Sequence, residues 1–210
     1  MTQATATIDR PALAAHPVTA PAATAHPAPA AHHATGAWYA VQVATGQEDR
    51  ALQFIREADE ADALDEVFVP RAAVGVYDKQ ARKWTHQDRT LFPGYLIAVA
   101  RDTAGMESTL RHARTFARAL GDQAGAVRLS DDEVAFLNAF TKRGQRTILP
   151  SHGYIEEGGR VVVTEGPLVG QEVLIVKVKH RQKRAVIRMR FCGRDKEVEV
   201  ALHLIRGRKA

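Results

Sequence analysis

Apolar residues recur in two different spacings between Trp38 and Thr141, and together they predict an α+β unit. Short apolar runs are typical of strands, whereas Ala51, Leu52, Ile55 and Ala58 recur at helical spacing. The predicted strands are 38–43, 66–69, 95–100 and 116–120, with a hairpin from 73–77 and 83–91, and the predicted helices are 47–59, 105–112 and 131–141. We therefore expect an antiparallel sheet with flanking helices.

The second part of the chain has a different pattern, which predicts a small antiparallel β-barrel. Four short apolar stretches, 160–164, 173–179, 184–191 and 197–202, alternate with turns. Periodicity fails before them, where polar residues and glycine dominate. The expected organisation is a tail at 1–36, an N-terminal domain at 37–143, a linker at 144–157 and a C-terminal domain at 158–210.

Local composition adds a tail and a charge asymmetry to this picture. Residues 1–36 are rich in Ala, Thr, Pro and His, with little to bury, so we expect them to be disordered and not to act as a signal peptide. Residues 160–210 hold 13 Lys and Arg against 5 Asp and Glu, a net charge of +8, whereas residues 1–159 carry −3. A basic C-terminal unit favours a polyanionic partner.

The residues that support catalysis or metal binding are missing from the sequence pattern. There is no phosphate-binding loop, no Gly-x-Ser-x-Gly motif and no zinc-ligand spacing. Cys192 is the single cysteine, which excludes an internal disulfide framework and is compatible with the cytoplasm. No apolar run approaches the roughly 18 residues of a membrane span. We expect no enzyme activity, no catalytic residues, no metal, no cofactor and no membrane partner.

Two short turn motifs carry a family resemblance. Phe92-Pro93-Gly94-Tyr95 follows Trp38-Tyr39 and the Thr45-Gly46-x-Glu48 stretch, while Gly166-Pro167-Leu168-x-Gly170 follows Arg160-Val161-x-Val163. Pro93 presets φ and Gly94 accepts positive φ, so the first motif turns the chain tightly. In order and spacing the chain resembles the NusG family of transcription elongation factors. The resemblance implies a NusG N-terminal domain followed by an SH3-like KOW barrel.

The resemblance also implies a polymerase-binding surface. In the family, an aromatic pocket grips the β′ clamp helices of RNA polymerase. This predicts contacts from Tyr39, Phe92, Pro93 and Tyr95, with Trp38 at the margin. A second family contact, with the β gate loop, predicts roles for Ser108 and Thr109. The alternative is that the aromatic side chains only fill the core and that the two hydroxyl groups are merely solvated.

A basic hairpin in the C-terminal unit predicts contact with nucleic acid. Its cations are Lys177, Lys179, Arg181, Lys183, Arg184, Arg188 and Arg190, with no acid between the first and the last. Strand alternation would place Lys177, Lys179 and Arg181 on one face, and Arg188 and Arg190 would share a face on the return strand, so that a continuous positive strip forms. Nascent RNA is the expected ligand, and seven phosphate contacts on duplex imply a log K against log [salt] slope near −6. The alternative is a solvated face.

The chain departs from the family at two positions, and one of them, Cys192, together with the basic hairpin favours a specialised paralogue of the LoaP or RfaH kind. Val173 stands where the family has a glycine, so its backbone is expected to avoid positive φ. Cys192 stands where the general factor has a phenylalanine that contacts a ribosomal protein, so contacts with a ribosomal protein or Rho are the weaker expectation. The expected function is control of pausing or termination, with processive antitermination favoured, in the bacterial cytoplasm within a nucleoid-associated transcription complex. The alternative is a KOW-type RNA-binding protein of the ribosome or its assembly.

Overall fold

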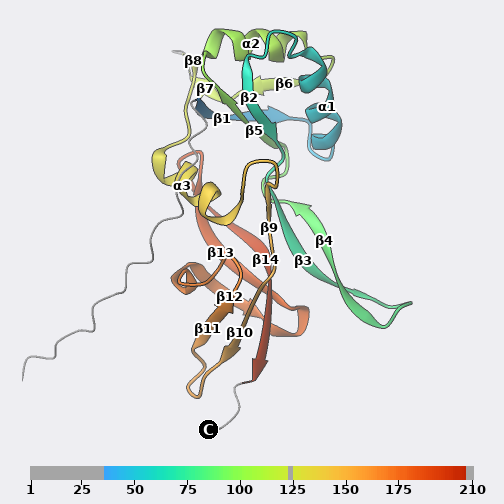
Figure 1. The fold of residues 1–210 in the computed structure, drawn as a ribbon, viewed down its shortest axis with the longest axis vertical. Coiled ribbons are helices and arrows are strands. Elements are labelled where there is room, and N and C mark those ends of the chain that lie inside the picture. Colours follow the sequence, from blue (N-terminus) through green and yellow to red (C-terminus); the bar gives the residue numbers. More distant parts are fainter. Residues whose placement is uncertain (1–35, 123–124, 207–210) are drawn as a thin grey trace, which may run out of the picture.

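The computed structural model describes residues 36–122 and 125–206 (Figure 1). The predicted tail therefore lies, apart from Gly36, outside the described residues. The described part contains three α-helices, α1 (Glu48–Ala58), α2 (Thr103–His112) and α3 (Asp131–Phe140). None of them combines the length and the hydropathy that a membrane span needs.

An antiparallel sheet organises the N-terminal unit. Its strands, in spatial order, are β2 (Leu64–Phe68), β5 (Tyr95–Ala100), β1 (Ala37–Val43) and the edge strand β6 (Ala117–Ala119). Helices α1 and α2 cover one face of this sheet, and α3 lies on the opposite side, towards the C-terminal strands (Figure 1). The predicted α+β class is confirmed, because strands and helices fall where the two apolar spacings placed them.

The helix ends follow from their capping residues. Ser130 Oγ accepts the Glu133 N–H, and the Glu133 carboxylate accepts the Ser130 N–H, so α3 begins with a capping box. Helix α2 begins two residues earlier than predicted, because the Asp102 carboxylate accepts the N–H groups of Ala104 and Gly105 at 3.2 and 2.7 Å.

The predicted hairpin forms a long arm that leaves the sheet and runs beside the C-terminal strands (Figure 1). Its strands are β3 (Arg71–Asp78) and β4 (Lys83–Thr90), and the short strand β9 (Thr147–Ile148) pairs parallel with the start of β3. A small ladder joins β7 (Gly121–Asp122) and β8 (Gly125–Ala126).

The C-terminal unit is an all-β region, as predicted. Its five-stranded sheet contains, in spatial order, β11 (Val161–Glu165), β10 (Ser151–Ile155), β14 (Arg194–Arg206), β13 (Arg184–Phe191) and β12 (Ile175–Lys179). Two 3₁₀ turns, η1 (Glu172–Leu174) and η2 (His180–Gln182), flank β12. Val173 lies in η1 and is not among the residues with positive φ, which confirms the expectation for its backbone.

The prediction of an irregular linker at 144–157 is wrong. This segment contains β9 and β10, and β10 pairs parallel with the last strand, β14, from Ser151↔Leu202 to Ile155↔Arg206. Strand β14 is also longer than its predicted 197–202. Strand β10 has the sequence Ser-His-Gly-Tyr-Ile, in which the first three residues carry no apolar side chain, so the apolar period that usually marks a strand is absent there. Pairing with an already formed sheet overrides the weak local preference.

The described residues pack into two hydrophobic cores, one on each face of the N-terminal sheet. One core joins Tyr39, Val41 and Leu96 to Ile55 of α1 and Met106 of α2. The other core starts from the opposite face of the same strands and continues without a break into the C-terminal unit. The two units therefore share one core, in an arrangement that we call the closed assembly.

Candidate functional site

The Leu91–Tyr95 turn is held rigidly by its backbone. Gly94 has φ +85°, and the Tyr95 N–H donates to the Phe92 carbonyl at 3.0 Å. The Gly94 carbonyl accepts the Val43 N–H at 2.9 Å, which ties the turn to β1. A Cβ on Gly94 would stand 2.9 Å from Thr45 Oγ1. The glycine is therefore required both by its φ and by this close approach.

Glu48 explains why an acid follows Thr45-Gly46 in the sequence. Its buried carboxylate accepts the Gly94 N–H at 2.7 Å, so the start of α1 grips the turn. Burial alone would raise the pKa of Glu48, but hydrogen bonds from the backbone N–H groups of Gly94, Glu48 itself and Gly46 lower it below its ordinary value. The carboxylate is thus ionised and acts as a fixed acceptor for the turn.

The turn presents Phe92 to the C-terminal unit. The rings of Phe92 and Phe191 are stacked, with centroids 3.8 Å apart and an interplanar angle of 8°. Tyr95 meets the same Phe191 ring edge-on at 5.6 Å. Phe92 is only 4% exposed as a result, whereas Pro93 beside it stays exposed. In the closed assembly, the aromatic side chain predicted to bind a partner is therefore covered by the C-terminal unit.

Trp38 lies on the same face of the sheet as Phe92, in the shared core. Its ring meets Phe68 at 5.7 Å, and the Arg146 guanidinium lies 5.0 Å from the Trp38 centroid and 4.6 Å from that of Phe68. Arg146 is held by Glu66 at 3.0 and 2.5 Å. Arg146 therefore attaches the segment after α3 to the N-terminal sheet beside Trp38, next to the predicted polymerase-binding residues.

Tyr39 is not brought to this cluster, which corrects its expected place in the pocket. Side chains alternate across a strand, so the neighbour of Trp38 faces the other way. Tyr39 is 2% exposed in the core beneath α1 and α2, and its hydroxyl group lies 3.0 Å from Thr103 Oγ1. It is a core residue in this fold.

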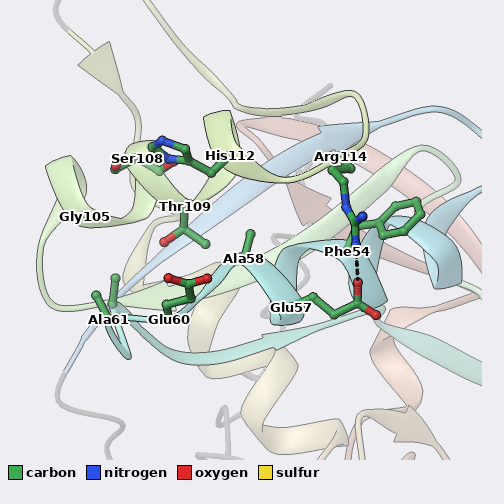
Figure 2. A pocket seen from close by; sticks show the side chains of 11 residues that line it. Phe54, Glu57, Ala58, Glu60, Ala61, Gly105, Ser108, Thr109, His112 and Arg114 are labelled. Atoms are coloured by element: carbon green, nitrogen blue, oxygen red, sulfur yellow. Dashed lines mark hydrogen bonds and ion pairs between the residues drawn. The ribbon is translucent and has the colours of Figure 1, made fainter.

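Ser108 and Thr109 lie on α2, on the far side of the sheet from Phe92. Both line a hollow of about 550 Å³ between α1 and α2 (Figure 2). Thr109 is buried and its hydroxyl group donates to Asp59 Oδ1 at 3.3 Å, so it links the two helices. Ser108 is half-buried at the rim. Of the two predicted hydroxyl contacts, only Ser108 is accessible.

Polar bonds also cross between the two units. Glu133 Oε1 of α3 accepts the Gly193 N–H at 2.9 Å, in the turn between β13 and β14. Burial would raise the pKa of Glu133, but bonds from Gly193 and Ser130, with the nearby charge of Arg190, lower it. On the hairpin side, the Gly75 carbonyl accepts from Arg184 Nε and Nη2 at 3.0 and 2.8 Å.

Most of the predicted cationic strip is already engaged. Glu199 on β14 pairs with Lys179 and Arg184. The hydrogen bond from Lys179 lowers the pKa of Glu199, burial opposes that shift, and Arg184 reinforces it. The segment from Lys177 to Arg190 contains no acid, so its cations looked free of ion pairs. Their acidic partners lie instead on the neighbouring strand β14.

The remaining cations are dispersed. Arg188 pairs with Glu197 at 3.3 Å. Lys183 has φ +52° and lies 5.2 Å over the Trp84 ring of the hairpin. Arg181 belongs to η2 and so does not share a strand face with Lys177. Lys177, Arg181 and Arg190 are the exposed cations of the seven that have no ion pair with a described residue.

Within 36–122 and 125–206, no group of three His, Cys, Asp or Glu side chains is arranged to hold a metal ion. Burial, followed by the charge of Glu133, raises the pKa of the Cys192 thiol to about 11, so the thiol stays protonated.

The N-terminal unit matches a family model described as transcription termination factor NusG over residues 36–138. This chain belongs to the NusG family. The model spans β1 to α3 and thus contains Glu48, the Phe92 turn and the hollow between α1 and α2.

Relatives extend the NusG match into the C-terminal unit. The transcription termination/antitermination protein NusG of Chlamydia trachomatis is 25% identical over 168 residues, covering 77% of this chain and 89% of the relative. The protein of that name from Yersinia pestis is 28% identical over 171 residues, covering 78% and 91%. The chain is therefore a NusG-type transcription factor.

A solved structure shows the same fold. The structure, described as a domain interaction in Thermotoga maritima NusG, aligns with a TM-score of 0.51 at 17% identity, covering 80% of this chain and 93% of that one. At this identity the likeness supports the NusG arrangement of sheet, helices and C-terminal strands, and no residue roles.

The sequence patterns did not identify three residues that lie around Phe92 and Trp38 or join the two units. Phe191 was passed over in favour of its neighbour Cys192, although only Phe191 has the alternation of a core-facing residue in β13. Glu133 was predicted only as part of a helix, and its bond to Gly193 has no local signal in the sequence. Arg146 lay in the predicted linker, where a lone cation among polar residues gives no sign of burial.

Proposed function

We propose that this NusG-family chain binds RNA polymerase through the surface centred on Phe92 and suppresses pausing or termination. The single observation that carries the proposal is the stack of Phe92 on Phe191, because it leaves a rigidly held aromatic side chain beneath a removable cover. Buried aromatic anchors are the usual source of interface energy. Polymerase as the partner, through its β′ clamp helices, comes from the family resemblance.

The closed assembly is then the resting state, and the C-terminal unit must leave before the polymerase can bind. If only a small fraction of the molecules is in the open, binding-competent form, the apparent affinity for the polymerase is the affinity of that form multiplied by its fraction. The domain interaction described for Thermotoga maritima NusG supports this view by analogy. Trp38 lies in the shared core on the same face as Phe92, the proposed anchor of the interface. Pro93 is exposed beside Phe92.

Separation of the two units would expose one surface on each of them, and both could contact the transcription complex. The N-terminal unit would bridge the polymerase cleft and favour the active clamp state, an effect that differential binding supplies without covalent chemistry. Ser108, at the rim of the hollow between α1 and α2, is the contact proposed for the β gate loop. The C-terminal unit would touch nascent RNA through Lys177, Arg181 and Arg190.

Opposite responses of the two stacked rings test the proposal. Phe92→Ala removes the anchor and should weaken polymerase binding roughly 30-fold, since about 2 kcal/mol corresponds to that factor. Phe191→Ala removes only the cover and should strengthen binding. Phe116→Ala, which changes a ring that is 58% exposed, is the matched control and should bind like the native chain. Equal affinity of the Phe92→Ala variant and the native chain would remove Phe92 from the interface.

The effect on elongation is measured separately, by transcription through a terminator with purified polymerase. The native chain should increase readthrough, and the Phe191→Ala variant should do so at lower concentration. Increased termination with the native chain would reverse the proposed sign while leaving the binding surface intact.

A further inference from the structure

Three histidines from both units meet where the hairpin arm lies against the C-terminal sheet. His86 on β4 and His203 on β14 have their Nε2 atoms 2.9 Å apart, and their ring centroids are 5.0 Å apart. His152 on β10 lies on the other side, with its ring centroid 5.0 Å from that of His203. The bond between His86 and His203 thus crosses the boundary that must open, while His152 and His203 belong to the same unit.

A hydrogen bond between two imidazole nitrogens requires that one of them carries no proton. One proton between the two Nε2 atoms is compatible with this bond. If both imidazoles are fully protonated, each Nε2 carries a hydrogen and the two N–H groups face each other without an acceptor. His86 and His152 are exposed and reach the solvent, whereas His203 between them is half-buried. Protonation of His203 is therefore the event that the closed assembly resists.

The charges around His203 make that resistance stronger. Burial, then the neighbouring His86, Lys183 and His152, lowers the pKa of His203 to about 4. Lys183 comes from the turn before β13, and it also reaches Trp84 across the boundary. Every charged group that acts on His203 is thus a cation or becomes one.

Three carboxylates lie near the histidines, and none of them acts on His203. Asp88, two residues beyond His86 on β4, accepts from Thr147 Oγ1 at 3.3 Å. Glu165 on β11 stands opposite His152 in the ladder, one strand further from His203. Glu199 is engaged by Lys179 and Arg184 on the same sheet, and His180 and Arg181 of η2 are exposed.

We propose that His86 and His203 form a pH-sensitive latch that holds the closed assembly at neutral pH and releases it on mild acidification. The proposal rests on the proposed function in one respect, namely that the two units separate. When the two units separate, His203 loses its contact with His86 and with the hairpin arm that covers it. Its affinity for protons then returns to that of an ordinary histidine. Since the closed form binds fewer protons than the open form, lowering the pH favours opening.

The size of the effect follows from the two affinities. With a pKa near 6.5 when open and about 4 when closed, one histidine changes the opening equilibrium by at most about tenfold between pH 7.5 and 5.5. Solvent at the exposed rings reduces this, so we expect a shift of about three- to tenfold. Acid well below pH 4 adds nothing further from this group, because His203 is then protonated in the closed form as well.

Hydrogen exchange of the Gly193 amide reports the opening directly in the full chain, because this N–H donates across the boundary to Glu133. Its protection factor should fall about three- to tenfold from pH 7.5 to 5.5. The Met106 amide of α2, bonded to Asp102 within the N-terminal unit, is the internal control and should keep its protection.

Three variants identify the residues responsible. His86→Gln and His203→Gln should abolish the pH response, because an amide side chain can donate or accept at either pH. His152→Gln is the matched control and should respond like the native chain, since His152 stays beside His203 when the units separate. Constant protection of Gly193 in the native chain, or a native response in both latch variants, would overturn the proposal.

The experiment contains no polymerase, so its result is separate from that of the binding test. If the chain is closed and its opening does not depend on pH, the proposed latch is wrong, and the proposed polymerase-binding surface is unaffected. A chain whose Gly193 amide is unprotected at both pH values overturns the latch together with the resting closed state, and Phe92→Ala then still tests the binding surface alone.

Discussion

The two faces of the N-terminal sheet are covered in different ways. Helices α1 and α2 cover one face with aliphatic side chains such as Ile55 and Leu110, and β5 supplies fully buried partners there. The other face is covered by α3 and by the C-terminal unit, which meets it through the shared core, through the ring contacts of Phe191 with Phe92 and Tyr95, and through polar bonds such as that of Glu133. The first contact resembles a domain interior, and the second resembles a separable interface between domains.

This difference indicates which interactions can change during function. Groups in the helix-covered core lose their partners only when the unit unfolds, so that core sets the stability of the unit. In the second interface, each polar group can exchange its partner for water at modest net cost. A mutation in each region should therefore be visible in a different measurement.

The largest expected effect is in the helix-covered core. Ile55→Ala removes a side chain that is 0% exposed and should lower the free energy of unfolding by about 3 kcal/mol. Urea unfolding followed by circular dichroism measures this change. Ile205→Ala, at a site that is 72% exposed, should change the stability by less than about 1 kcal/mol. If the two variants are equally stable, the helix-covered core is not the main source of stability.

Two buried carboxylates allow the same comparison at a smaller scale. Glu48 holds the Gly94 N–H within one unit, and Glu133 holds the Gly193 N–H across the two. Removing either charge by Glu→Gln should cost about 2 kcal/mol. For Glu48→Gln the loss should appear in unfolding, because the turn belongs to the N-terminal unit. For Glu133→Gln part of the loss should appear as reduced protection of the Gly193 amide.

The pH dependence of these carboxylates has a defined sign. Both have a pKa below the ordinary value of 4.5, so they bind protons less readily in the native state than in the unfolded state. Their stabilisation is complete above the ordinary value and is lost as the pH falls through the lowered native values. The Gln variants should therefore lose less stability on acidification than the native chain. A parallel acid response would contradict ionised carboxylates at these positions.

Most elements of the fold were predictable, because their signals are local. The apolar run after Gly94 and the spacing of α1 each identify one element, and the residues around Ser130 specify the start of α3. Strand β10 was not predictable, since its polar sequence becomes a strand only by pairing with β14, some fifty residues later. Pairing between distant segments leaves little trace in either segment.

The candidate site was predictable only in part, for a related reason. Phe92 and the turn around it are specified locally by Pro93 and Gly94, whereas its cover, Phe191, lies about a hundred residues away. Tyr39 was placed in the pocket by the family resemblance, but neighbours in a strand face opposite sides, so Tyr39 lies in the core beneath α1 and α2. The basic hairpin looked uncompensated because Glu199 lies on the next strand.

The smallest expected effect concerns the cations of the C-terminal unit, where free and engaged side chains lie on the same strand. If only Lys177, Arg181 and Arg190 reach phosphates, the slope of log K against log [salt] on single-stranded RNA should be near −2, compared with about −5 for all seven cations. Lys177→Gln should reduce the slope by about 0.7. Lys179→Gln, two residues along β12 and paired with Glu199, should leave it nearly unchanged. Filter binding of a short RNA over a salt series measures both slopes. Equal slopes for the two variants would mean that the ion pairs on β14 open when RNA binds, so that the compensation seen in the closed assembly does not limit the basic surface.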